Sequence, residues 1–133
     1  MLLDTSFIID LLAGDSKAKH LAQEIDSSGT AIQIPTPVVF ELWAGAGRAL
    51  RSPTERRKLS EVLLAYPTVS FESDDAQAAG RLQAALRQEG RPMGTVDVQL
   101  AGMALARQDT VVTGDRDFNR VGHGVRSRSY LQP

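Results

Sequence analysis

The sequence predicts an α/β fold in which helices cover both faces of a parallel β-sheet. Short apolar and β-branched segments alternate along the chain with longer segments whose apolar residues recur at helical spacing. This alternation is typical of a parallel sheet, because the connection between two parallel strands is usually a helix. Four acids stand near the predicted strand-to-helix junctions, and they are Asp4, Glu41, Asp97 and Asp115.

The chain opens with an apolar strand at residues 1–3, followed by two helices and a second strand. The cap-forming run Asp4-Thr5-Ser6 begins the first helix, and Gly14 ends it. Residues 31–35 form the second predicted strand. The apolar stripe of the second helix recurs at i, i+3, i+4 and i+7, and consists of Ala18, Leu21, Ala22 and Ile25.

Two more helices are predicted before the third strand. Thr36 caps the first of them, with Pro37 at its first position, and this helix carries Glu41 and runs to about Leu50. The second begins at a capping box, Ser-Pro-Thr-Glu at residues 52–55. Its buried stripe consists of Leu59, Val62 and Leu63.

The rest of the chain continues the alternation. Residues 68–71 form the third predicted strand, and Ser73 then caps a long helix that Gly90 closes. Thr95 caps the next helix, which carries Asp97 on its apolar face. Residues 110–113 form the fourth strand, residues 114–118 a turn, and residues 125–130 an edge strand.

Length and composition predict one domain spanning residues 1–133. No stretch approaches the ~20 apolar residues of a membrane span. Asp4 and Asp10 interrupt the apolar N-terminus, which argues against a secretion signal. The absence of cysteine excludes disulfides and thiolate metal sites. Together these features predict a cytoplasmic protein without a membrane partner.

The net charge of −1 excludes a strongly basic nucleic-acid binder, but the positive charges are unevenly distributed. One basic cluster occupies eleven residues of sequence. It is either a solvated helix surface or a contact for a phosphate backbone. Its members are Arg48, Arg51, Arg56, Arg57 and Lys58.

Acids at the carboxyl ends of parallel strands are expected to meet in one crevice, where they repel one another unless cations bind. Oxygen ligands without cysteine suit Mg²⁺ or Mn²⁺. Glu41 is harder to explain as a capping acid than Asp4 or Asp97, because it lies beyond the first helical turn and an unpaired carboxylate among Phe40, Leu42 and Trp43 is costly. Asp4 and Asp97, taken singly, are also compatible with helix capping. The acids as a set predict metal-assisted hydrolysis of phosphate esters.

The ordered set of acidic motifs resembles the PIN-domain family and, within it, the VapC-type toxins of toxin–antitoxin pairs. Together the matching motifs span nearly the whole chain. They are L-D-T-S at residues 3–6, T-P-V-V-F-E-L at residues 36–42, V-D-V-Q-L-A at residues 96–101 and T-G-D-R-D-F at residues 113–118.

The resemblance implies a three-layer α/β/α sandwich with a central parallel sheet and the activity of a Mg²⁺- or Mn²⁺-dependent endoribonuclease. Asp4, Glu41, Asp97 and Asp115 match the acids of the family's site. Asp117 matches a further acid of that region, although it could equally pair with a neighbouring arginine. Thr5 and Thr113 match the small hydroxyl residues that orient the acids. The sequence departs from the family at Gly114, where the family often has Asn, so one side-chain hydrogen bond to the Asp115 loop is expected to be lost.

The resemblance also implies partners: an RNA substrate such as tRNA or rRNA, a VapB-type antitoxin and a second copy in a homodimer. The basic cluster at residues 48–58 would contact the RNA backbone. Phe40 and Trp43 are candidates for the antitoxin groove, with core packing as the alternative for Trp43.

Three rival interpretations of the sequence each fail to account for some of its residues. A haloacid-dehalogenase-like phosphatase needs a second Asp two residues after Asp4, where this chain has Ser6. A receiver domain needs a late lysine, but none follows Lys58. A binding module that no longer cleaves would not require all four acids.

Overall fold

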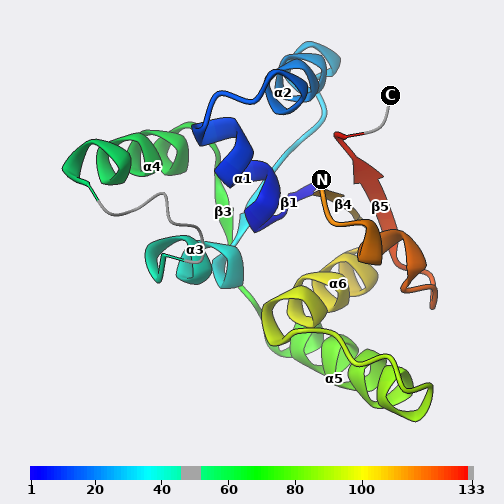
Figure 1. Ribbon diagram of the computed structural model, residues 1–133. Coiled ribbons are helices and arrows are strands. Elements are labelled where there is room, and N and C mark those ends of the chain that lie inside the picture. Colours follow the sequence, from blue (N-terminus) through cyan, green and yellow to red (C-terminus); the bar gives the residue numbers. More distant parts are fainter. Residues whose placement is uncertain (46–51, 132–133) are drawn as a thin grey trace.

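Parallel strands form the middle of the fold in the computed structural model, which describes residues 1–45 and 52–131 (Figure 1). β4 pairs in parallel with both β1 and β5, and β2 pairs in parallel with β3. A parallel bridge between Leu2 and Gln33 joins the two groups, giving the order β3-β2-β1-β4-β5. The strands are β1 (Leu2–Leu3), β2 (Ile34–Pro35), β3 (Thr68–Val69), β4 (Thr110–Thr113) and β5 (Arg126–Ser129).

This strand order brings the two ends of the chain together. β1 comes from the N-terminus and lies beside β4, with Leu2 opposite Val111 and Leu3 opposite Val112. Asp4 follows β1 directly, and Asp115 follows β4 after one intervening residue. Because the two strands are parallel, both acids lie at the same edge of the sheet.

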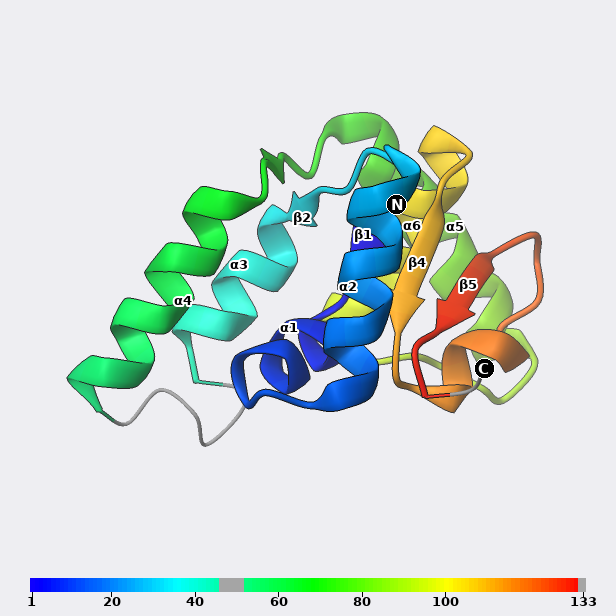
Figure 2. The ribbon, with the colours of Figure 1, turned by 90° about the horizontal axis from the view of Figure 1, so that it is seen from above.

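Helices cover both faces of the sheet, as Figures 1 and 2 show from two directions. On one side lie α1 (Thr5–Leu12) and α2 (Ser16–Ser28), and on the other α5 (Ser73–Gln88) and α6 (Thr95–Arg107). α3 (Thr36–Trp43) and α4 (Pro53–Ala65) lie side by side near β2 and β3. The predicted three-layer α/β/α fold is confirmed. Among the described helices, none has the length and apolar character needed to cross a bilayer.

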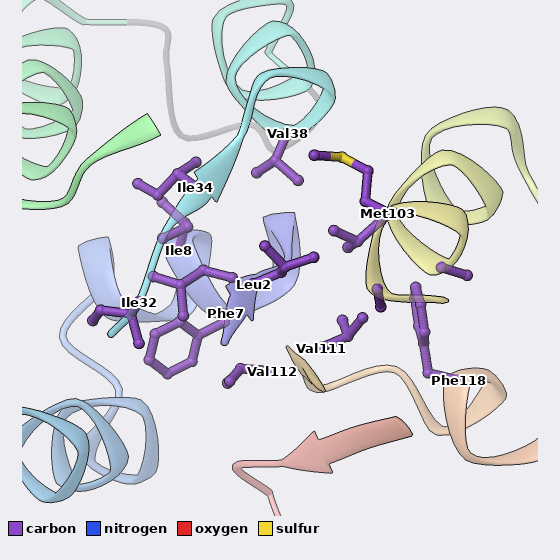
Figure 3. Close-up of a cluster of buried hydrophobic side chains, with 14 of the residues drawn as sticks. Leu2, Phe7, Ile8, Ile32, Ile34, Val38, Met103, Val111, Val112 and Phe118 are labelled. Carbon is purple, nitrogen blue, oxygen red and sulfur yellow. The ribbon is translucent and has the colours of Figure 1, made fainter. Parts of the chain in front are cut away.

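The hydrophobic core is centred on β1 and β4 (Figure 3). Leu2 and Val111 are completely buried, which explains why these short strands are apolar without alternation. Phe7 and Ile8 of α1 pack on one face and Met103 of α6 on the other. The predicted stripe of α2 is also confirmed, since all four of its apolar residues are buried.

α5 and α6 pack against each other unusually closely. A Cβ atom added at Gly102 of α6 would lie 2.5 Å from the Cα and Cβ atoms of Ala79 on α5. Asp75, which is 2% exposed, accepts hydrogen bonds from Arg107 at 2.8 and 3.1 Å. This pair joins the start of α5 to the end of α6. Burial alone would raise the pKa of Asp75, but the hydrogen bonds and charge of Arg107, with the Glu72 N–H, lower it overall.

Three predicted N-caps are wrong by one residue. Thr36, Ser73 and Thr95 are the first residues of their helices rather than the caps. The hydroxyl of Thr36 instead accepts a hydrogen bond from the Phe71 N–H at 3.1 Å, which ties α3 to the segment after β3. The residues at the cap positions are Pro35, Glu72 and Gly94.

The prediction that the third helix continues to about Leu50 is also wrong. α3 ends at Trp43, because Gly45 adopts the left-handed conformation (φ 78°) that closes helices. Leu50 itself lies outside the described residues. The next helix begins as predicted, with Ser52 and Glu55 forming both hydrogen bonds of a capping box.

A candidate active site of converging carboxylates

Asp4 is held at the end of β1 by three hydrogen-bond donors. The Thr5 N–H donates to Oδ1 at 2.6 Å, while the hydroxyls of Ser6 and Thr113 donate to Oδ2 at 3.0 and 2.5 Å. The side chain is buried, with 4% exposed. Burial raises the pKa of Asp4 above its ordinary value, and the nearby charge of Glu41 raises it further, although the three donors oppose this shift. Asp4 therefore serves as the helix cap of α1 and also faces another acid.

Asp115 lies in the turn after β4, and Thr113 connects it to Asp4. The Thr113 hydroxyl donates to Asp4 and also accepts a hydrogen bond from the Asp115 N–H at 2.9 Å. Asp115 in turn caps the short 3₁₀ helix η2 (Arg116–Arg120), because its Oδ1 accepts from the Asp117 N–H at 2.8 Å. One buried hydroxyl thus sets the positions of two acids that are far apart in sequence.

Asp97 reaches the site from the first turn of α6. It does not follow a strand, as the sequence suggested, because α6 comes after α5. Nor does it cap its helix: Gly94 is the N-cap, and the Asp97 carboxylate accepts no hydrogen bond from the described residues. Burial raises the pKa of Asp97 to about 6, with further contributions from the charges of Asp4, Asp115, Glu41 and Asp117. Asp97 thus lies within electrostatic reach of every predicted site acid.

Glu41 completes the group from the second turn of α3. Its side chain is partly buried, and its charge raises the pKa of both Asp4 and Asp97. The structure therefore brings together four carboxylates from four separate elements, hereafter the acid cluster: Asp4, Glu41, Asp97 and Asp115. Asp117 stands next to this cluster on an exposed part of η2.

The donor chemistry of the acid cluster fits a hard divalent cation, since it offers carboxylate oxygens alone. Within residues 1–45 and 52–131, however, no three acid or histidine side chains are grouped so that they could hold a metal ion as they stand. The hydroxyl of Thr5 is buried and has no hydrogen-bond partner among the described residues. Such an orphan is the kind of group that an ordered water or ion satisfies. The two predicted hydroxyl residues thus differ in how they contact Asp4. Thr113 donates a hydrogen bond from its side-chain hydroxyl, whereas Thr5 donates one from its backbone N–H.

The comparisons with known proteins agree with this geometry. The family model of the PIN domain matches residues 1–124. The chain belongs to the PIN-domain family. The resemblance to VapC-type toxins that the motifs suggested is confirmed.

Two relatives of known sequence match almost end to end. The tRNA(fMet)-specific endonuclease VapC of Salmonella typhimurium is 25% identical over 126 residues, which cover 94% of this chain and 93% of that protein. Ribonuclease VapC2 of Rickettsia felis is 24% identical over 121 residues, 90% of each chain.

Solved structures match over a similar extent. DNA-bound VapBC from Salmonella typhimurium superposes with a TM-score of 0.81 at 26% identity, covering 97% of this chain and 96% of that one. VapBC2 from Rickettsia felis, bound to a promoter fragment, superposes with a TM-score of 0.85 at 21% identity, covering 96% of both chains. At this identity the match shows a similarity of fold.

Three residues of the basic cluster are described by the structure, and these three do not join the acid cluster. Arg56, Arg57 and Lys58 are exposed on α4, and α3 lies between α4 and α6 in both views (Figures 1 and 2). Arg48 and Arg51 fall outside the described residues.

Some residues beside the acids were not singled out from the sequence as part of the site. Ser6 belongs to the L-D-T-S motif, and its hydroxyl both donates to Asp4 and accepts from the Gly114 N–H at 3.1 Å. The Asp115 loop is thus held by Ser6 and Thr113, despite the lack of a side chain at position 114. Tyr130 and Asp10 also contact this region, but no local pattern marks them.

Proposed function

We propose that this chain is a VapC-type ribonuclease toxin that cuts RNA phosphodiester bonds with the help of Mg²⁺ or Mn²⁺. The observation that carries the proposal is the acid cluster, in which burial and the charges of the three other acids, together with that of nearby Asp117, raise the pKa of Asp97 to about 6. Carboxylates that perturb one another in this way mark functional sites more often than structural ones. The names of the curated relatives, both ribonucleases, support the same reaction.

Within this proposal, Asp4, Glu41, Asp97 and Asp115 hold the cation, and Asp117 is a further candidate. A bound divalent cation would supply positive charge at the scissile phosphate and make an attacking water more acidic. Asp97 is a candidate for the general base, because it lies beside the other acids and its carboxylate accepts no hydrogen bond from the described residues. The Thr113 hydroxyl holds Asp4 and Asp115 in position relative to each other, because it hydrogen-bonds to both residues.

The proposed substrate is RNA of the tRNA or rRNA class. The Salmonella relative is named for tRNA(fMet). Arg56, Arg57 and Lys58 project from α4 and are candidates for contacts to the phosphate backbone, together with Arg48 and Arg51. Such contacts would position the RNA without selecting its sequence.

The proposed protein partners are a VapB-type antitoxin and a second copy of the chain. The solved relatives include toxin–antitoxin complexes from Salmonella typhimurium and Klebsiella pneumoniae. On α3 and α4 three large apolar side chains are exposed: Phe40 by 69%, Trp43 by 48% and Leu64 by 88%. Exposed apolar residues of this size on two adjacent helices are typical of a protein interface. Core packing, the alternative considered for Trp43, is therefore wrong.

Cleavage of purified tRNA and rRNA in Mn²⁺ or Mg²⁺ tests the proposal. We expect discrete fragments from the wild type, and none with EDTA or from the Asp4→Ala and Asp97→Asn variants. Asp74→Asn is the matched control, because Asp74 is an exposed acid in the first turn of another helix. Fragments from all variants alike would indicate a contaminating nuclease. No cleavage by a folded wild type, together with no rise of its Tm in millimolar Mn²⁺, would favour the binding-module alternative.

A further inference from the structure

Tyr130 connects the C-terminal end of the sheet to the first helix. It stands directly after β5, is 6% exposed, and its ring packs edge-on against Phe7 with centroids 5.2 Å apart. Its hydroxyl donates toward two acceptors one helical turn apart on α1: the carboxylate of Asp10 and, at 3.1 Å, the carbonyl oxygen of Ser6. A single side chain thus anchors two successive turns of α1.

The same hydroxyl fills the space that a side chain at position 114 would need. A Cβ atom built on Gly114 would lie 2.6 Å from the Tyr130 hydroxyl oxygen and 2.8 Å from Cζ. Both distances are far below van der Waals contact, so position 114 accepts only glycine while Tyr130 keeps this place. The turn after β4 and the Tyr130 ring are therefore in direct steric contact.

From this contact two short paths lead to the acid cluster. The Gly114 N–H donates to the Ser6 hydroxyl at 3.1 Å, and that hydroxyl donates to Asp4 at 3.0 Å. On the other side of Gly114, Asp115 is tied through its own N–H to Thr113. A shift of Tyr130 would consequently move the Ser6 hydroxyl, the Gly114 amide, or both.

We propose that Tyr130 is a positioning residue for the acid cluster, acting through Ser6 and Gly114. Burial raises the pKa of Tyr130 above its usual range, and the hydrogen bond to Asp10 raises it further. The phenol therefore stays protonated and remains a hydrogen-bond donor at neutral pH. The inference rests on the proposed ribonuclease function, because it assigns Tyr130 a role in that same site.

Kinetics of RNA cleavage in Mn²⁺ provide the first test, with Tyr130→Phe, Gly114→Ala and the double variant. Tyr130→Phe removes only the hydroxyl. We expect kcat to fall on the order of ten-fold with KM little changed, because misplaced catalytic groups slow the chemical step more than binding. The Mn²⁺ concentration for half-maximal rate should rise as well. The double variant should lose less than the product of the two single losses, because Tyr130→Phe removes the closest of the contacts that a Cβ atom at position 114 would make and both substitutions disturb the same contact.

Tyr66→Phe is the matched control. It deletes the hydroxyl of the chain's other tyrosine, which forms no side-chain hydrogen bond within residues 1–45 and 52–131. Its kinetics should equal those of the wild type. Wild-type kcat and Mn²⁺ dependence in a folded Tyr130→Phe variant, or strictly multiplicative losses in the double variant, would overturn the inference.

Amide hydrogen exchange supplies a readout that does not depend on cleavage. In Tyr130→Phe the amides of Gly114 and Asp115 should exchange at least several-fold faster than in the wild type, and in Tyr66→Phe they should not. Unchanged exchange overturns the role of Tyr130 whatever the wild type does to RNA. Faster exchange in a protein whose wild type fails to cut RNA would instead reject the ribonuclease function and leave Tyr130 as the anchor of this turn.

Discussion

Among single residues, Asp97 shows the mutual repulsion within the acid cluster most clearly. The first turn of a helix normally favours an ionised acid. Here burial and the surrounding carboxylates outweigh that preference and raise the pKa of Asp97 to about 6. Because the folded protein holds this proton more tightly than the unfolded chain does, ionisation of Asp97 costs folding free energy. That cost is fully present once the pH exceeds the folded pKa.

We therefore predict that Asp97→Asn abolishes cleavage but raises the stability of the protein in EDTA. The free energy of unfolding at pH 7 should increase by about 1–3 kcal/mol, measured by urea denaturation. In the wild type, the contribution of Asp97 should decrease stability as the pH rises from 3.8 to about 6, and the variant should lack this slope. Mn²⁺ should stabilise the wild type and not the variant. Equal stability of the two proteins at pH 7 in EDTA would contradict the repulsion inferred for the cluster.

Among the secondary-structure elements, the α5–α6 pair sets the position of Asp97. The close approach of Gly102 to Ala79 brings the two helices together along their length. The ion pair between Asp75 and Arg107 joins the C-terminal end of α6 to the N-terminal end of α5. Because α6 carries Asp97 in its first turn, the packing of this helix pair determines where that carboxylate lies relative to Asp4. Stability and site geometry are therefore linked through one helix interface.

Two glycine-to-alanine substitutions should have opposite effects on stability. Gly102→Ala would place a methyl group 2.5 Å from the backbone of Ala79, so the helices must separate. We expect a loss of about 1–3 kcal/mol of unfolding free energy, typical of overpacking. Gly80→Ala, on the exposed side of α5 with nothing within 4 Å, should instead increase stability by about 0.5–1 kcal/mol through helix propensity. Urea denaturation measures both, and a neutral Gly102→Ala would disprove the tight contact.

Across the molecule as a whole, α3 carries residues of both the apolar surface and the acid cluster. Phe40 and Trp43 are exposed on α3, close in sequence to Glu41, and Leu64 is exposed on α4. The other three acids lie at the carboxyl ends of β1 and β4 and in the first turn of α6. A partner that binds the exposed apolar residues of α3 would therefore lie close to Glu41.

We predict that Trp43→Ala weakens binding of a co-purified VapB-type antitoxin by at least about 30-fold, as expected for an interface hot spot. RNA cleavage by the free variant should stay near the wild-type rate. Trp43 is the chain's single tryptophan, so its fluorescence should also shift to shorter wavelength when the antitoxin binds. Leu131→Ala, which removes an exposed apolar side chain elsewhere, is the control. Undiminished affinity in Trp43→Ala would place the antitoxin on another surface.

Local signals in the sequence predicted the alternation of strands and helices, the capping box at Ser52 and the four acids that the structure brings near one another. Each of these depends on signals within a few residues: apolar periodicity, cap chemistry, or a short acidic motif. The predicted N-caps Thr36, Ser73 and Thr95 are each one residue too late. In a sequence, a hydroxyl residue at the first position of a helix cannot be told from one at the cap position before it.

Three features could be seen only in the folded chain: the strand order, the close packing of Gly102 on Ala79, and the contact of Tyr130 with Gly114. The tertiary structure also decided that Asp97 enters the acid cluster from a helix that follows another helix. These features join residues that are distant in sequence, and each partner alone looks ordinary: a glycine, an alanine, a tyrosine near the C-terminus. The structural role of these residues depends on how closely they approach one another and on how deeply they are buried. No local pattern in a single sequence specifies either quantity.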